Sequence, residues 1–319
     1  MQPARPDHYL RSCLRALVGV FVFVAFGAAA PLLAKNSRTE HLVVDPYGIE
    51  IWFEPGHEKI ARKVAEICEE SIPELAEGVG LDRVEPFRIH LVESIRVIEL
   101  EAGVDLPSWG IAFAFVDSRV MVIDVRRATA AWNTLERVVP HELSHLLAGQ
   151  RIEGVQVPTW FLEGMAMWQA REWSLLENWR LMDAVWTKRA PRLEGLIRGI
   201  PGEERTAHDA YRISYAGFTY LFDERMADLP DFLGHIARTG DFGEAFDSYW
   251  GEGQGAFYGR FAEHITRKYS SRLLLFQTGP LFSIIAVLFL FVFLKIRWRN
   301  RRKLKHMERV DQGLTSDDW

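Results

Sequence analysis

The chain has 319 residues, of which 48% are hydrophobic and 25% charged, and its formal net charge at pH 7 is -5. This composition is ordinary for a globular protein and excludes a chain dominated by disorder or collagen-like repeats. The acidic balance argues against a globally basic nucleic-acid binder, so we expect no nucleic-acid partner. Only two cysteines occur, Cys13 and Cys68, which excludes a disulfide-framed mini-domain and a cysteine-rich zinc module.

An apolar segment follows a short basic leader at the start of the chain. Residues 16–34 read ALVGVFVFVAFGAAAPLLA and come after Arg5, Arg11 and Arg15. A positive leader before an apolar stretch and small residues is typical of a secretory signal. The stretch is also nearly long enough to stay in a bilayer as an anchor. We therefore expect residues 1–34 to be a signal peptide or an N-terminal membrane anchor, and both alternatives stay open.

A second apolar segment predicts a transmembrane helix near the end of the chain. Residues 273–294 contain no charge, and at about 1.5 Å per residue they reach about 33 Å, enough for the hydrocarbon core. Seven lysines and arginines follow between Lys295 and Lys305. Such a cluster belongs on the cytoplasmic side and could contact anionic lipid. We expect a cytoplasmic tail at 295–319, attachment to the inner cell membrane, and a periplasmic or other extracytoplasmic location for the residues before the span.

The middle of the chain, residues 41–270, predicts one α+β domain. Apolar residues recur at three- and four-residue steps between Ile60 and Leu75, which predicts an amphipathic helix that Pro73 bends or ends. Beyond Ala130 the pattern is helical, and strands followed by helices indicate an α+β fold. Short apolar or alternating runs predict the strands at residues 42–44, 49–53, 87–91 and 120–125. One later helical face collects Leu175, Leu176, Trp179, Met182 and Trp186.

The motif with the clearest chemistry is His141-Glu142-Leu143-Ser144-His145. In a helix, positions i and i+4 share a face, so His141 and His145 can direct imidazole nitrogens at one metal ion. Zinc suits this pair, because it accepts nitrogen ligands and prefers four of them. Glu142 would reach a water molecule on the metal, where a carboxylate acts as general base. The sequence therefore predicts a Zn²⁺ site with hydrolytic chemistry.

A third metal ligand is predicted at Glu163. This is the only charged residue between Val155 and Ala170. Burying a carboxylate unpaired in so apolar a segment is costly, and metal ligation removes that cost. The alternatives are an ordinary salt bridge or a side chain that faces water, and the pattern itself leaves both open.

Three segments follow one another along the chain: Val139–Leu146 (VPHELSHL), Trp160–Ala166 (WFLEGMA) and Ala210–Leu221 (AYRISYAGFTYL). Together and in this order they resemble the gluzincin metallopeptidases, and within them the peptidase MA-like domains of exported bacterial proteins. The resemblance covers roughly residues 85–270. It implies a zincin-like fold, with a small N-terminal sheet followed by a mostly helical lobe.

The resemblance also implies roles for individual residues. His141, His145 and Glu163 would hold zinc, and Glu142 would activate the water. Tyr211 would donate a hydrogen bond to the oxyanion, with Tyr215 as the alternative; either tyrosine could instead be an ordinary core residue. Residues 109–114 would lie at an edge strand that pairs with the substrate backbone.

Three features depart from the family pattern. Pro140 precedes the first histidine and is expected to start or kink the helix there. Position 167 is methionine, so no acidic residue lies four positions after Glu163 to brace a histidine. No motif for binding a substrate N-terminus is recognisable, which favours an endopeptidase.

Two functional hypotheses follow. The first is a membrane-tethered zinc peptidase that hydrolyses peptides or proteins outside the cytoplasm. The second is a zincin-shaped binding or assembly module at the membrane that has no catalytic activity, and it rests on Pro140 and on the missing acidic brace.

Overall fold

The computed structural model describes residues 39–96, 98, 106–107, 109–130, 134–222, 228–269 and 283–299. The chain divides into two compact units, Met1–His264 and Ile265–Trp319. The predicted signal or anchor at 1–34 lies outside the described residues, as do 273–282 of the predicted span and 300–319 of the predicted tail. In the second unit, residues 283–299 form a helix. Among the residues that the structure describes, no helix combines the length and apolar character that crossing a bilayer requires.

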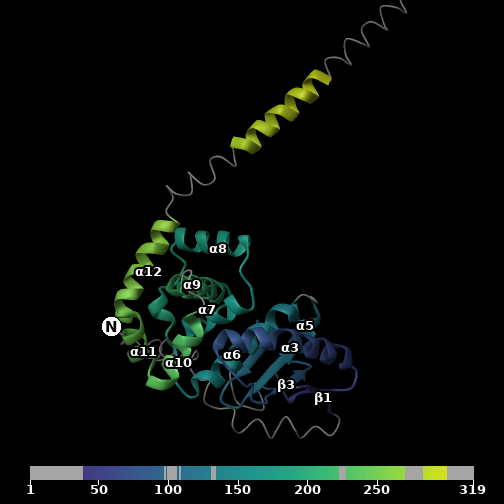
Figure 1. Cartoon of the computed structure of the whole chain (residues 1–319). Helices are drawn as coiled ribbons and strands as arrows, with labels where there is room; N and C mark the ends of the chain where they lie inside the picture. The colour runs from purple at the N-terminus through teal and green to yellow at the C-terminus, as the bar shows by residue number, and fades with distance from the viewer. Residues whose placement is uncertain are drawn as a thin grey trace, which may run out of the picture. The chain divides into compact units, whose positions relative to one another are not determined.

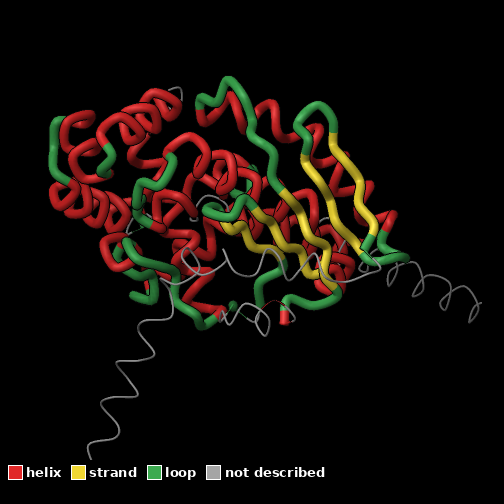
Figure 2. The backbone as a smooth tube through the Cα atoms, turned by 90° about the horizontal axis from the view of Figure 1, so that it is seen from below, coloured by secondary structure: helices red, strands yellow, loops and turns green. Residues whose placement is uncertain are grey.

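The described part of the first unit begins with a five-stranded mixed sheet (Figure 2). β2, β3 and β5 are parallel to one another, whereas β1 and β4 run antiparallel to their neighbours. β5 is buried along its whole length, because strands flank it on both sides. Across the sheet the order is β1 (Glu40–Val44), β2 (Ile49–Phe53), β3 (Arg88–Val92), β5 (Val120–Asp124) and β4 (Ala112–Phe115). The four strands predicted from the sequence are confirmed, and β4 supplies an edge strand at the segment indicated by the family resemblance.

Two long helices, α3 (Glu58–Val79) and α6 (Leu135–Ile152), pack against each other and against the sheet (Figure 1). Pro73 does not end α3, which continues through Val79. The reason is packing: Ile72 before the proline and Leu75 after it are both buried, so burial of the apolar face outweighs the missing hydrogen bond.

After the sheet, every described element is helical, which confirms the α+β order. The centre of the helical part is aromatic: the ring of Phe161 lies within 6.2 Å of Phe218, Phe222, Phe232 and Phe242, measured between centroids. α7 and α9 make the most extensive helix contact, and it places the site described below. The elements are α5 (Val125–Ala130), α7 (Thr159–Gln169), α8 (Leu175–Trp186), a 3-10 turn (Leu193–Leu196), α9 (Glu204–Phe222), α10 (Leu229–Thr239), α11 (Phe242–Trp250) and α12 (Gln254–Lys268).

One histidine of the sheet, His90, is buried and has a lowered pKa. His90 on β3 is 8% exposed and stacks against Trp52 of β2 at 6.4 Å between ring centroids. Burial, reinforced by the neighbouring Arg88, lowers the pKa of His90 to about 4. The folded sheet therefore holds the neutral imidazole at pH values where an unfolded chain would protonate it.

Replacing His90 by phenylalanine should make the protein less sensitive to acid. Because the folded pKa lies below the ordinary value of 6.5, the stabilisation is complete above pH 6.5 and is lost as the pH falls toward 4. At about 1.4 kcal/mol for each pH unit, the loss is about 3 kcal/mol, and His90→Phe should avoid it. Urea unfolding of both chains at pH 7 and pH 4 measures this difference; parallel pH dependences would contradict the assignment.

Candidate active site

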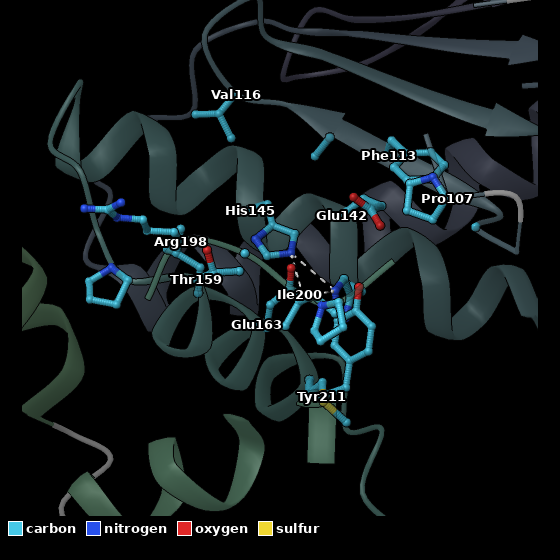
Figure 3. A pocket seen from close by; sticks show the side chains of 18 of the residues that line it. Pro107, Phe113, Val116, Glu142, His145, Thr159, Glu163, Arg198, Ile200 and Tyr211 are labelled. Carbon is cyan, nitrogen blue, oxygen red and sulfur yellow. Dashed lines mark hydrogen bonds and ion pairs between the residues drawn. The ribbon is translucent and has the colours of Figure 1, made fainter. Parts of the chain in front are cut away.

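A cleft of about 2470 Å³ opens between the edge strand β4 and the helices that follow the sheet (Figure 3). Its walls include β4, the middle of α6, the start of α7, the segment before α9 and the first turns of α9. Trp109 bridges two of these walls, because its Nε1 donates a hydrogen bond to the carbonyl of Gly202 at 3.3 Å. On the sheet side, Arg127 Nη1 donates to the carbonyl of Gly110 at 2.6 Å and holds the segment that leads into β4.

The two motif histidines project from adjacent turns of α6. Their Nε2 atoms lie 3.3 Å apart, as the four-residue spacing predicts. Between them in sequence, the buried Ser144 donates a hydrogen bond from Oγ to Gln169 Oε1 at 2.5 Å, which ties α6 to the end of α7. Pro140 does not start the helix, which begins at Leu135. The motif therefore lies within a continuous helix, and Pro140 is buried on its inner side.

Glu163 comes to the same point from α7. Its Oε2 lies 3.3 Å from His141 Nε2 and 3.6 Å from His145 Nε2. The sequence left open that Glu163 forms an ordinary salt bridge or faces water. The second alternative is excluded, because the Glu163 carboxylate contacts both imidazoles in the cleft. Among the described residues, this trio is the only group of at least three possible ligands whose atoms all lie within 4.8 Å of one another.

The spacing of these three atoms fits a zinc ion. Zinc binds nitrogen and oxygen at about 2.0–2.1 Å with tetrahedral angles, which places neighbouring ligand atoms about 3.4 Å apart. The three separations here are 3.3, 3.3 and 3.6 Å. Two imidazoles and one carboxylate form a donor set that zinc accepts and that leaves a fourth position free.

Glu172 is a site residue that the sequence did not indicate. Its Oε1 lies 3.0 Å from His141 Nδ1, so it can accept the proton of that nitrogen and leave Nε2 free to face the ligand position. The missing acidic residue at Met167 is therefore replaced by a carboxylate five positions later. This contact fixes both the tautomer and the orientation of the first histidine.

The end of α7 explains how Glu172 reaches His141. Arg171 has a φ of +54°, the left-handed conformation that usually selects glycine. Its backbone N–H bonds to the carbonyl of Trp168 at 3.1 Å, and that of Glu172 bonds to the carbonyl of Met167 at 3.0 Å. This pair of bonds defines a Schellman motif. Helix α7 therefore carries the candidate ligand Glu163 near its start and ends in a turn that positions Glu172 beside His141.

Three carboxylates face the two imidazoles in a buried setting. Burial alone would lower the pKa of His141, but Glu172 and Glu163 outweigh it and raise that pKa well above its ordinary value. Burial alone would raise the pKa of Glu163, but His145 and His141 lower it to about 2. Glu163 is thus a carboxylate at any physiological pH. The excess of negative charge suits the binding of a cation.

Glu142 lies beside the trio and against the edge strand (Figure 3). Burial raises its pKa, an effect that His141 and His145 partly offset. The backbone N–H of Ala114 on β4 hydrogen-bonds to its carboxylate. A carboxylate with a raised pKa that neighbours the metal position suits a general base.

The structure separates the two tyrosines that the sequence left as alternatives. Tyr211 lines the cleft, and its ring meets those of His141 and Trp109 edge-on at 6.4 and 6.1 Å between centroids. Burial and the nearby carboxylates raise the pKa of Tyr211, so its hydroxyl stays protonated and able to donate. Tyr215 stacks on Trp173 at 4.1 Å, and the cleft lining does not include it.

Gly164 explains how closely α7 approaches α9 beside the ligand. A Cβ at this position would overlap the carbonyl oxygen of Ser214 and the side chain of Phe218. Any larger residue would push α7 away from α9 and move Glu163 with it.

Comparison with known proteins agrees with the motifs. The sequence model of the peptidase MA superfamily matches residues 67–263. This is more than half of the chain, and the chain therefore belongs to the peptidase MA superfamily. A comparison with curated protein sequences finds no match.

Comparison with solved structures finds distant similarity. Native leukotriene A4 hydrolase from Saccharomyces cerevisiae matches with a TM-score of 0.41 and 12% identity, over 66% of this chain and 36% of that one. A mutant of the M1 zinc metallopeptidase from Deinococcus radiodurans matches with a TM-score of 0.34 and 16% identity, over 73% of this chain and 51% of that one. The chain thus spans about one third to one half of these proteins.

Removing the Glu172 carboxylate should weaken zinc binding without unfolding the protein. Loss of such a brace typically costs about 10- to 100-fold in metal affinity. We expect Glu172→Ala to show the larger loss and Glu172→Gln a smaller one, because the amide oxygen still accepts from His141 Nδ1. Competition with a chelator measures the affinity, and unchanged affinity in Glu172→Ala would contradict the role.

Proposed function

We propose that the chain is a zinc-dependent peptidase that hydrolyses peptide bonds in peptide or protein substrates. The observation that carries the proposal is the meeting of His141, His145 and Glu163 within 3.6 Å, with the carboxylate of Glu142 beside them. Membership of the peptidase MA superfamily supports the same reaction class.

In the proposed reaction, each side chain of the site has a separate role. When bound, zinc would polarise the scissile carbonyl and lower the pKa of a water molecule. Glu142 takes the proton of the attacking water and passes it to the leaving amine, since a carboxylate with a raised pKa can do both. Tyr211 donates its hydroxyl proton in a hydrogen bond to the carbonyl oxygen as negative charge develops there. Glu172 holds His141 in the orientation that this arrangement needs.

We further propose endopeptidase action. The cleft extends in two directions from the trio: Phe113 and Pro107 lie toward one end, and Arg198 and Thr159 toward the other (Figure 3). A substrate could therefore continue on both sides of the cleaved bond. The edge strand β4 borders this path, and an extended peptide can add to such an edge through backbone hydrogen bonds.

Membrane attachment and an extracytoplasmic site remain part of the proposal. The uncharged segment 273–294 and the basic residues after it support a tether with the tail in the cytoplasm. The peptidase domain would then act on the periplasmic side of the inner membrane.

Glu142→Gln should abolish hydrolysis while keeping the metal. The amide cannot accept the proton, so we expect a fall in kcat of about 10²- to 10⁴-fold with zinc content unchanged. Glu136→Gln is the matched control, because it makes the same change at an exposed position on the same helix. Cleavage of a peptide library, followed by mass spectrometry, provides the readout. Equal rates for Glu142→Gln and the unaltered chain would refute the mechanism.

Tyr211→Phe should lower kcat by about 10²- to 10³-fold with little change in KM, since the hydrogen bond strengthens only as the oxyanion forms. Tyr215→Phe removes a hydroxyl one helical turn away and should leave kcat almost unchanged. Steady-state kinetics on one cleaved peptide compares the two. A large loss in Tyr215→Phe and none in Tyr211→Phe would reverse the assignment.

A further inference from the structure

Helix α8 presents an apolar stripe to solvent. Leu175 is 83% exposed, Trp179 47% and Trp186 62%, and Leu176 beside them is 56% exposed. Positions 175, 179, 182 and 186 recur at steps of four, three and four, so they share one helix face. The buried residues of α8, Leu181 and Ala184, lie on a different face. A contiguous apolar surface of this kind marks an interaction site.

The stripe lies within a basic stretch of an acidic chain. Residues 171–192 contain five basic and three acidic side chains, a net charge of 5 − 3 = +2, whereas the whole chain carries -5. Arg180 pairs with Glu177 and Arg189 with Asp183, while Glu172 contacts His141, so the positive excess lies with Arg171, Lys188 and Arg192.

The basic side chains around the stripe are accessible. Arg171 and Arg192 are 76% and 85% exposed, and each is paired with an exposed carboxylate, Glu74 and Glu194, in a surface ion pair that contributes little stability and can open toward a partner. Lys188 is also exposed. A partner with an apolar interior and a negative surface matches both features.

We propose that α8 docks onto an anionic lipid surface, with Leu175, Trp179 and Trp186 at the boundary between headgroups and acyl chains. Tryptophan favours this boundary, and an amphipathic helix with basic flanks lies in its plane. The inference rests on the proposed membrane tether, which would keep the domain beside a bilayer, and it is independent of the peptidase chemistry. The proposed tether and the docked helix α8 would attach the domain to the membrane at two points and so fix the orientation of the domain.

Docking through the stripe would leave the cleft on the opposite face of α8, one helix diameter (~10 Å) from the lipid surface. Glu177 and Arg180 of α8 line the cleft, and Glu177 Oε2 accepts a 2.6 Å hydrogen bond from Arg212 Nε, next to Tyr211. Glu172, the brace of His141, precedes α8 by three residues. The site would therefore be held near the membrane surface without contacting the lipid.

Site-specific fluorescence on the full chain tests the docking. Leu175→Cys, in a Cys13→Ser background, is labelled with an environment-sensitive fluorophore; Cys68 stays in place because it is buried and its pKa is raised to about 12. Glu70→Cys, on an exposed position of α3, is the control. The chains are reconstituted into phosphatidylcholine vesicles containing about one quarter phosphatidylglycerol, with and without brominated acyl chains.

The docking proposal predicts a blue shift for the label at position 175 and loss of about half its intensity in brominated vesicles, with neither effect at position 70. Adding Trp179→Glu and Trp186→Glu should abolish both effects. A label at 175 that behaves like the one at 70 would overturn the proposal. So would a blue shift that brominated lipid does not quench and that disappears on dilution, since it would identify a second copy of the chain as the partner.

Two further readouts separate this proposal from the proposed function. Flotation of the chain with vesicles reports the tether, so flotation without quenching at 175 overturns docking alone. The same quenching in a Glu142→Gln background shows that docking holds whatever the outcome of the peptidase assay.

Discussion

Three ligand atoms from two helices must lie close enough together to bind one metal ion. The packing around these helices serves this requirement. α6 supplies His141 and His145, and α7 supplies Glu163, so the distance between the helices sets the geometry of the site. The Ser144–Gln169 hydrogen bond fixes the two helices to each other, and Gly164 lets α7 lie directly against α9. The aromatic core around Phe161 packs α7 against Phe218 of α9 and against α10 and α11.

The end of α7 connects the fold to the chemistry of the first histidine. A left-handed residue, Arg171, turns the chain so that Glu172 meets His141. This contact bears on the alternative of a non-catalytic module, because the missing acidic residue at position 167 was one of its two supports. The other support was Pro140, which lies inside α6 and leaves both histidines on one face. We therefore favour the hydrolase over the binding module.

The sequence indicated those features that regular geometry dictates. Alternation of apolar residues located the strands, and the four-residue spacing of the histidines was sufficient because a helix places i and i+4 together. Glu163 was found as an isolated charge in an apolar segment. Glu172 was missed, since its position depends on a Schellman turn built on arginine, where glycine is the usual signal. Of the two effects predicted for Pro73, ending the helix is wrong, because packing on both sides of the proline lets α3 continue to Val79. The signal or anchor, the membrane span and the location stay predictions.

The central claim is that the chain binds one zinc ion through these three side chains. X-ray absorption at the zinc edge of the purified full-length chain, with metal content measured on the same sample, tests it most directly. We expect one zinc per chain, surrounded only by nitrogen and oxygen at about 2.0–2.1 Å, with imidazole scattering that accounts for two histidines. A chain that takes up no zinc, or a zinc with sulfur in its coordination shell, would contradict the account.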